Sequence, residues 1–348
     1  MPIWPSLPWN GRTDGGCRTV THCLLAGRIP AHDIVADVII LALDRVDDTI
    51  AAIRSAQSQV GVSVHVHVLD QGSAPDNLAR LRASIDGNCS LWASDRNLGV
   101  AGGRNLLSGL GRGRAIVALD NDAVFASEDT VARLVAALDA EPALAVVGCR
   151  IVAYGTGSDD LSSWGYPRAL LTASGEAFDA VTYVGAGHAI RRSAWEDAGG
   201  YDSALFFCWE EFDFALRAIA LGWRIRYRGD IVIRHKVAAE QRVTWSNHRW
   251  FYFVRNRLYI ARKYGLTAWP RLLGYCVKGL LNGMPVTTVR AILATSQMNA
   301  GCIGNKLGER AADYLRRNDR LHRGGWLKRL RLEVFAAFGS SVAASAGR

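Results

Sequence analysis

The stretch Ala-Ile-Val-Ala-Leu-Asp-Asn-Asp, residues 115–122, decides the fold of this sequence. Its first five residues are an unbroken apolar run, which is typical of a strand buried on both faces of a parallel sheet. Two carboxylates, Asp120 and Asp122, follow directly. Because open α/β sheets bind ligands beyond the carboxyl ends of their strands, this order predicts a functional edge at these two aspartates.

The residues before this stretch alternate between strand patterns and helix patterns. The expected strands are 38–43, 62–69 and 91–93, and the expected helices are 47–58, 75–85 and 105–110. Such alternation indicates a parallel α/β sheet with helices on both faces. Asp70, which follows the second of these strands, should therefore lie on the same edge as Asp120.

The same alternation continues further along the chain. The expected elements are helices at 130–140, 193–198 and 210–221, strands at 144–152, 181–185 and 223–232, and a polar loop at 154–176. From about Trp245 the pattern is helical, basic and aromatic. We therefore expect three regions: a poorly ordered or loosely packed extension at 1–34, an α/β domain at 35–245, and a basic helical region at 246–348.

The composition fits a folded protein with anionic partners. Hydrophobic residues make up 49% and charged residues 21%, and the net charge is +9. A basic balance favours nucleotide phosphates, nucleic acid or an anionic membrane surface. The seven cysteines include no CxxC pair, which argues against disulfides and structural zinc. With neither a secretory pattern nor an apolar run of about 18 residues, we expect a cytoplasmic protein, at most at the inner face of the membrane.

Three further segments combine residues suited to chemistry. In 70–73, Asp70 could accept hydrogen bonds from a base or ribose, or it could only form a turn. The glycine-rich segment 97–105 opens a helix whose amides could approach a phosphate, with Arg104 adding charge, although it is not GxGxxG. In 209–217, Glu210 and Asp213 share a helix face, which first-turn electrostatics alone could explain.

Taken together, these segments resemble the family 2 glycosyltransferases with the GT-A fold, in the branch of bacterial rhamnosyl- and related cell-surface sugar transferases. The matching segments, in family order, are Val68–Ser73, Asn97–Asn105, Asp120–Asp122, Gly185–Asp202 and Glu210–Asp213. The resemblance covers about residues 36–260. It implies a mostly parallel nucleotide-binding sheet flanked by helices, with a C-terminal helical extension.

The resemblance also implies a mechanism and its residues. A divalent ion, Mg²⁺ or Mn²⁺, would be held by Asp120 and Asp122, with His235 as a further ligand. The sugar would transfer with inversion, and Glu211 would take the proton of the acceptor hydroxyl, supported by Glu210 and Asp213. The other implied contacts are Asp70, Gly72, Asn97, Gly99, Arg104, Asp120 and Gly187 for the nucleotide sugar, and Trp209, His188 and Arg217 for the acceptor.

For substrates, we expect a UDP- or dTDP-sugar rather than a GDP-sugar as donor. The acceptor would be a glycan, a lipid-linked molecule or a small molecule, met by 154–180 and the C-terminal helices. Such a hexosyl- or deoxyhexosyltransferase would serve cell-surface glycan or glycosylated metabolite biosynthesis. The basic amphipathic stretch 326–332 suggests peripheral contact with anionic lipid.

Two positions depart from the family pattern. The first strand ends in Leu43-Asp44-Arg45 instead of a Thr/Asn-type turn, and the family's Glu-Asp pair is Glu210-Glu211 here. Alternative interpretations are a sugar-nucleotide pyrophosphorylase, whose Gly-rich phosphate signature 38–46 lacks, and a non-catalytic GT-A binding protein. A nucleic-acid protein is not expected, because no recognised DNA- or RNA-binding motif is present.

Overall fold

The computed structural model describes residues 22–28, 33–236, 246–298 and 307–324. The stretch 326–332, to which the sequence analysis assigned lipid contact, lies outside these residues, as do 1–21 and 29–32 of the N-terminal extension. Among the helices that are described, none combines the length and the apolar character needed to cross a membrane.

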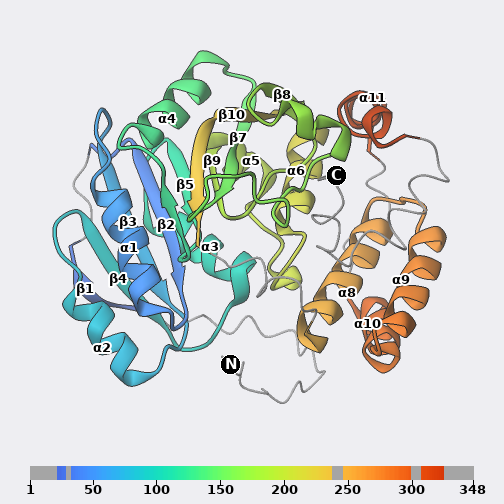
Figure 1. The fold of residues 1–348 in the computed structure, drawn as a ribbon, viewed down its shortest axis with the longest axis horizontal. Helices are drawn as coiled ribbons and strands as arrows, with labels where there is room; N and C mark the ends of the chain where they lie inside the picture. The colour runs from blue at the N-terminus through green and yellow to red at the C-terminus, as the bar shows by residue number, and fades with distance from the viewer. Residues whose placement is uncertain (1–21, 29–32, 237–245, 299–306, 325–348) are drawn as a thin grey trace, which may run out of the picture.

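The centre of the molecule is a ten-stranded sheet in the order β1-β4-β3-β2-β5-β9-β7-β10-β6, with β8 pairing β10 (Figure 1). Its strands are β1 (His22–Gly27), β2 (Ala36–Ala42), β3 (Val64–Asp70), β4 (Cys89–Ser94), β5 (Ala115–Leu119), β6 (Ala123–Phe125), β7 (Leu144–Ala153), β8 (Ala177–Ala180), β9 (Gly187–Arg191) and β10 (Arg224–His235). Strands β4, β3, β2, β5, β7 and β10 point the same way, and the other four run against them. The expected mostly parallel sheet is confirmed.

Helices cover both faces of this sheet. They are α1 (Val46–Gln57), α2 (Pro75–Ala83), α3 (Gly99–Leu110), α4 (Thr130–Ala140), α5 (Arg192–Ala198) and α6 (Glu210–Ala220). Along β2, Val38 and Ile40 point into a core shared with α1, α2 and α4, whereas Ile39 points into a core shared with α3, α5 and α6. The period-two alternation of the strands thus builds two apolar layers.

The C-terminal helices form an appendage beside α6 (Figure 1). They are α8 (Asn247–Lys263), α9 (Trp269–Leu281), α10 (Pro285–Gln297) and α11 (Glu309–Asn318). Helices α8, α9 and α10 share a small core around Trp250, Tyr275 and Met284. Helix α11 packs on the sheet domain, where the Tyr314 hydroxyl donates to the backbone oxygen of Ile225. The expected C-terminal helical extension is therefore present.

Three elements differ from the sequence prediction. Residues 22–27 of the extension form β1, an edge strand on β4, because their backbone can pair although most of their side chains are exposed. No strand forms at 181–185; β8 precedes this segment and β9 follows it. Helix α3 begins at Gly99 instead of Asn105, so Gly102 and Gly103 lie inside the helix.

Candidate active site

The paired ends of β6 and β10 bring two predicted metal ligands together. In this antiparallel pair Ala123 faces His235, and the Lys236 amide donates to the Asp122 carbonyl at 2.7 Å. His235 Nε2 then lies 3.0 Å from Asp122 Oδ1. Asp120 follows β5 directly, so both carboxylates lie beyond the same sheet edge, as predicted.

Asp120, Asp122 and His235 form a cluster that could hold a metal ion. One ligand atom from each residue lies within 4.8 Å of the others. Asp122 and His235 are buried, whereas Asp120 is half-buried. Carboxylate oxygens suit Mg²⁺ and Mn²⁺, and an imidazole nitrogen adds preference for a transition metal. The donor set fits a divalent cation.

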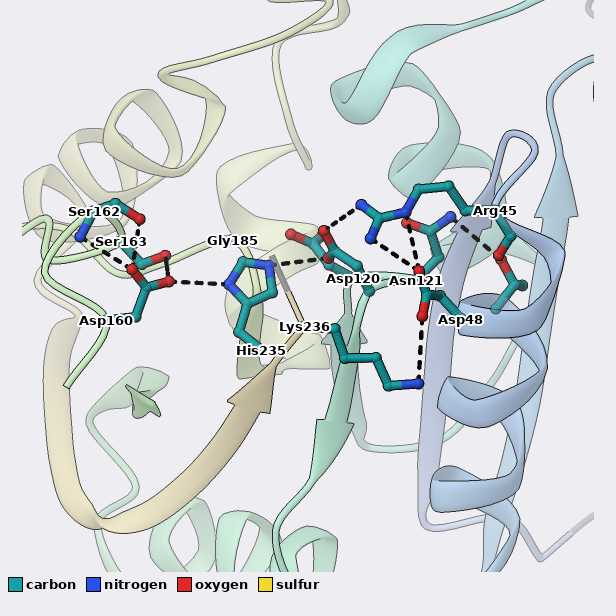
Figure 2. A network of polar contacts seen from close by, with 12 residues as sticks. Arg45, Asp48, Asp120, Asn121, Asp160, Ser162, Ser163, Gly185, His235 and Lys236 are labelled. Carbon is teal, nitrogen blue, oxygen red and sulfur yellow. Dashed lines mark hydrogen bonds and ion pairs between the residues drawn. The ribbon is translucent and has the colours of Figure 1, made fainter. Parts of the chain in front are cut away.

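A second carboxylate orients His235 from the other side of its ring (Figure 2). Asp160 Oδ2 lies 3.2 Å from His235 Nδ1. The Asp160 carboxylate also accepts from the Ser162 amide at 3.0 Å and from the Ser163 hydroxyl at 2.7 Å. Such a partner fixes the ring orientation of a histidine ligand. From the sequence, Asp160 is expected only in a polar loop, because no local pattern links it to His235.

Arg45 contacts the same cluster from the end of β2. Its Nη1 donates to Asp122 Oδ2 at 2.8 Å, and its Nη2 donates to Asp48 at 2.9 Å. Figure 2 shows Lys236 beside this group, with its ammonium 3.4 Å from Asp48. Asp44 and Arg45 have φ angles of 53° and 49°, a conformation that non-glycine residues rarely adopt. Strained backbone of this kind clusters at functional sites.

Arg104 connects the predicted metal ligands to the predicted base. From α3, its Nη2 donates to Asp120 Oδ1 at 2.8 Å and to the Gly185 carbonyl at 2.7 Å, and its Nη1 donates to Glu211 at 3.2 Å. Only 2% of Arg104 is exposed. Burial opposes its charge, but the carboxylates of Asp120 and Glu211 hold the pKa of Arg104 above its ordinary value. It is therefore a fixed cation between two anions.

Glu210 and Glu211 begin α6 and differ in their surroundings. Burial raises the pKa of Glu211, against the charge of Arg104. Burial and the neighbouring Glu211 charge raise the pKa of Glu210 well above its ordinary value. Within the described part of the chain, Glu210 Oε2 is buried without a hydrogen-bond partner. Burial therefore favours the protonated form of Glu210 more strongly, whereas Arg104 favours the anionic form of Glu211.

The turn that leads into α6 has a strained backbone and is held by hydrogen bonds from α8. Phe206, Cys208 and Trp209 all have φ between 61° and 73°. Asn256 of α8 donates from Nδ2 to the carbonyls of Leu205 and Phe207 at 2.8 Å each and to that of Cys208 at 2.9 Å. These bonds fix the direction in which α6 presents its first two glutamates.

The turn after β3 is tied to the turn after β2. Asp70 is 2% exposed and accepts from the Gly72 amide at 3.0 Å and from the amide and hydroxyl of Ser73. The Asp44 amide donates to the Ser73 hydroxyl at 2.8 Å, and the Asp44 carboxylate accepts from the Ala74 amide at 2.9 Å. Asp70 therefore forms the turn, which is one of the two roles expected for it from the sequence.

The backbone amides at the start of α3 donate hydrogen bonds to other groups of the protein. Leu98 donates to Gln71 Oε1 at 2.9 Å, and Gly99 donates to Asn97 Oδ1 at 2.8 Å. The amides of Val100 and Ala101 both donate to the Phe206 carbonyl. In this structure these four amides are paired within the protein, and the expected phosphate contact stays a prediction. The glycines serve close packing, since a Cβ on Gly99 would collide with the Phe206 carbonyl.

Five other predicted residues lie in protein contacts outside this cluster. Asp213 is fully buried and bonds Lys263, Tyr264 and Arg217. His188 lies between the Val184 carbonyl and the Tyr201 hydroxyl. A Cβ on Gly187 would collide with Ile233, and the Trp209 indole donates to the Phe253 carbonyl at 3.0 Å. Gly185, by contrast, lies against Glu211.

Two comparisons with solved structures agree on the fold. The mannosyltransferase PcManGT from Pyrobaculum calidifontis, in complex with GDP-Man and Mn²⁺, has a TM-score of 0.54 and 16% identity over 90% of this chain and 88% of that chain. GalNAc-T7 with UDP, GalNAc and Mn²⁺ has a TM-score of 0.57 and 14% identity over 82% of this chain and 55% of that chain. The expected GT-A type fold is confirmed.

Two comparisons of sequence find similarity over part of the chain. The succinoglycan biosynthesis protein ExoO of Rhizobium meliloti (strain 1021) is 43% identical over 95 residues, which are 27% of this chain and 27% of that protein. The match thus spans about a quarter of that relative. The model of the family described as Glycosyl transferase family 2 matches residues 37–199, which include Asp120 and Asp122 of the candidate site. The resemblance found in the sequence is confirmed over residues 37–199, which match the model of the family 2 glycosyltransferases.

Proposed function

We propose that this chain is an inverting, divalent-metal-dependent glycosyltransferase. The observation that supports this most is the continuous polar path from the Asp120, Asp122 and His235 cluster through Arg104 to Glu211. A leaving-group site and a proton acceptor must lie close together for a direct displacement. The family match over 37–199 supports the same reaction class.

Asp120, Asp122 and His235 would hold Mg²⁺ or Mn²⁺. The ion would neutralise the charge that develops on the departing nucleoside diphosphate. In the present structure Arg104 and Arg45 contact the two aspartates. These hydrogen-bonded ion pairs set the directions of both carboxylates. The Mn²⁺ in both solved structures of similar fold supports this choice of metal class.

Glu211 would act as the general base. The acceptor oxygen forms a bond to the anomeric carbon as the bond from that carbon to the diphosphate oxygen breaks. The acceptor proton passes to a Glu211 carboxylate oxygen, and the nucleoside diphosphate leaves with the bonding electron pair. A carboxylate whose pKa is raised by burial is a stronger base than an exposed one.

The donor would be a UDP- or dTDP-sugar, and the transferred group a hexose or deoxyhexose. The two similar structures contain different nucleotides, GDP in one and UDP in the other, so the comparison leaves the base to experiment. The similarity to a succinoglycan biosynthesis protein supports a cell-surface glycan or its lipid-linked precursor as acceptor. The enzyme would act in the cytoplasm, at the inner face of the membrane.

Calorimetry of nucleoside diphosphate binding tests the metal part of this proposal. UDP, dTDP and GDP would each be titrated with Mn²⁺ and then with EDTA. We expect binding of one of them that EDTA abolishes and that Asp122→Ala weakens at least about tenfold, because Asp122 supplies a carboxylate ligand. Asp139→Ala, which removes an exposed ion pair with Arg114 on α4, is the control and should bind normally. Binding that is indifferent to EDTA would refute the metal assignment.

A further inference from the structure

The C-terminal helices have an unusual charge composition. Between Gln241 and Gly308 the sequence contains no aspartate or glutamate, and every charged residue is Lys or Arg. This interval includes all of α8, α9 and α10. Since the charges of one sign are not compensated along the chain, this part of the molecule attracts anions.

Helix α9 exposes its apolar side instead of its polar side. Its exposed positions follow helical spacing and are Trp269, Leu272, Leu273, Val277 and Leu280, of which Trp269 and Leu280 are each 69% exposed. The opposite side, with Gly274, Tyr275, Lys278 and Gly279, is buried. Lys278 is 3% exposed, and its ammonium lies over the Trp250 ring. A helix that only covers a core in water has the reverse arrangement.

Helix α10 has the same arrangement, with apolar side chains exposed and polar side chains buried. Val286, Val289 and Leu293 are all more than half exposed. Thr288 and Thr295 are buried, and the Thr288 hydroxyl accepts from the Trp250 indole at 2.8 Å. The space between α9 and α10 is so close that a Cβ on Gly279 would collide with Thr288. Both helices thus contact α8 through small and polar groups as well as through Tyr275 and Met284, and most of their other large apolar side chains face outward.

We propose that this surface, the α9–α10 face, binds to an anionic lipid surface. The face consists of the exposed apolar residues named above together with Leu281, Arg271 and Arg290. In Figure 1 α9 and α10 lie at the edge of the molecule, with α8 between α9 and the sheet domain. Apolar side chains would enter the boundary between headgroups and acyl chains, and the arginines would meet lipid phosphates.

Charge decides between lipid and a second copy of this chain. In a symmetric dimer the α9–α10 face would meet itself, which would bring the arginines of both copies together. An anionic bilayer instead supplies the missing negative charge and an apolar layer at the same depth. Lipid is therefore the occupant that fits both properties of the face.

Co-sedimentation with vesicles tests this proposal. The full chain should bind vesicles that contain phosphatidylglycerol much more tightly than pure phosphatidylcholine vesicles, and more weakly as salt is added. The double variant Leu280→Glu, Leu293→Glu should lose at least about tenfold in binding, because burial of two leucines is lost. Arg290→Gln should lose about fivefold, since one cation near the surface is removed.

Leu221→Glu provides the matched control. Leu221 is 57% exposed at the end of α6, outside the α9–α10 face, so this variant should bind vesicles as the wild type does. Unchanged circular dichroism and melting would show that each variant is folded. Wild-type protein that ignores phosphatidylglycerol at low salt, or a leucine double variant that binds as the wild type does, would overturn the proposal. So would a lipid-free dimer that the double variant dissociates.

Discussion

At the scale of single residues, Arg104 determines the electrostatics of the candidate site. Its guanidinium contacts Asp120 on one side and Glu211 on the other, and almost none of it is exposed. A buried cation in this position favours the anionic form of Glu211. Glu210, one residue away, has no such contact among the described hydrogen bonds, and its pKa is raised well above the ordinary value. Two adjacent glutamates therefore have different chemical roles available to them.

Glu211→Gln should preserve donor binding and lower kcat by at least about 100-fold. Gln has nearly the same shape and still bonds Arg104, but it does not accept a proton, and general bases typically contribute about 10²–10⁴-fold. Steady-state kinetics with calorimetric donor binding would measure the two effects separately. Glu210→Gln is the neighbouring control and should cost less. If Glu210→Gln were the inactive variant and Glu211→Gln were normal, the assignment of the base would be displaced by one residue.

Gly185→Ala should lower kcat without unfolding the protein. A Cβ at this position would overlap a Glu211 carboxylate oxygen, so the carboxylate would have to leave its place beside Arg104. A base displaced by even about 1 Å can cost 10²-fold. Gly109→Ala is the matched control, because a Cβ there meets no atom within 4 Å. Equal kcat values for both alanine variants would argue against a role for the Glu211 position.

At the scale of elements, α8 positions the start of α6. The turn before α6 has three non-glycine residues with positive φ, and the Asn256 amide holds three carbonyls of that turn. Residues in such backbone conformations persist only where the surroundings impose them, at a cost of about 1–3 kcal/mol each. Helix α8 lies outside the matched family segment of 37–199, yet it supports the proposed base.

Asn256→Ala should lower kcat more than it changes the KM for the donor. Without the amide the turn can relax, and the first two residues of α6 lose their fixed direction. Kinetics and limited proteolysis at residues 205–209 would measure both consequences. Asn247→Ala on the same helix is the control, because Asn247 is exposed and, among the described hydrogen bonds, accepts one from the half-buried Thr287. An Asn256→Ala enzyme with normal kcat would show that other contacts suffice to hold the turn.

The strands and helices of the matched domain could largely be predicted, because apolar runs and helical spacing are local signals. The two aspartates of 120–122 were found for the same reason, since they directly follow a strand. Asp160 and Arg45 were not assigned to the site, because their contacts with His235 and Asp122 join distant parts of the chain. The glycines of 97–105 are expected to approach a phosphate, and the structure shows that Gly99 and Gly103 also allow close packing. Residue type alone does not separate these two uses of glycine.

At the scale of the whole molecule, the sheet contains a cluster of buried polar residues at strand positions where apolar side chains are usual. Asp37 is fully buried and accepts from the Gly113 amide and from Arg192, both at 2.7 Å, with His67 at 3.3 Å. Burial would raise the pKa of Asp37, but His67, Arg192 and Gly113 hold it below its ordinary value. His65 lies beside His67, with ring centroids 4.6 Å apart.

His65 should make the protein less stable as the pH falls from about 6.5 to about 4. Burial, and the neighbouring His67, lower the pKa of His65 to about 4 from an ordinary value of 6.5. The unfolded chain then binds a proton in this range that the folded chain does not bind, so unfolding becomes easier as the pH falls. The loss attributable to His65 between pH 7 and pH 5 is about 2 kcal/mol. Urea denaturation at both pH values would measure it.

His65→Phe isolates this contribution, because it keeps a ring in the core and removes the titrating group. It also removes the bond between His65 Nε2 and the Ser90 hydroxyl, so stability at pH 7 should fall by about 1 kcal/mol. The further fall between pH 7 and pH 5 should then be smaller than in the wild type by about 2 kcal/mol. The Ser90 hydroxyl keeps contacts with the Trp92 indole and with His67, which limits the cost of the substitution. The same fall of stability in both proteins would mean that the folded state accommodates a protonated His65. The acid sensitivity would then come from other buried groups. His188 is one such group, because burial lowers its pKa as well.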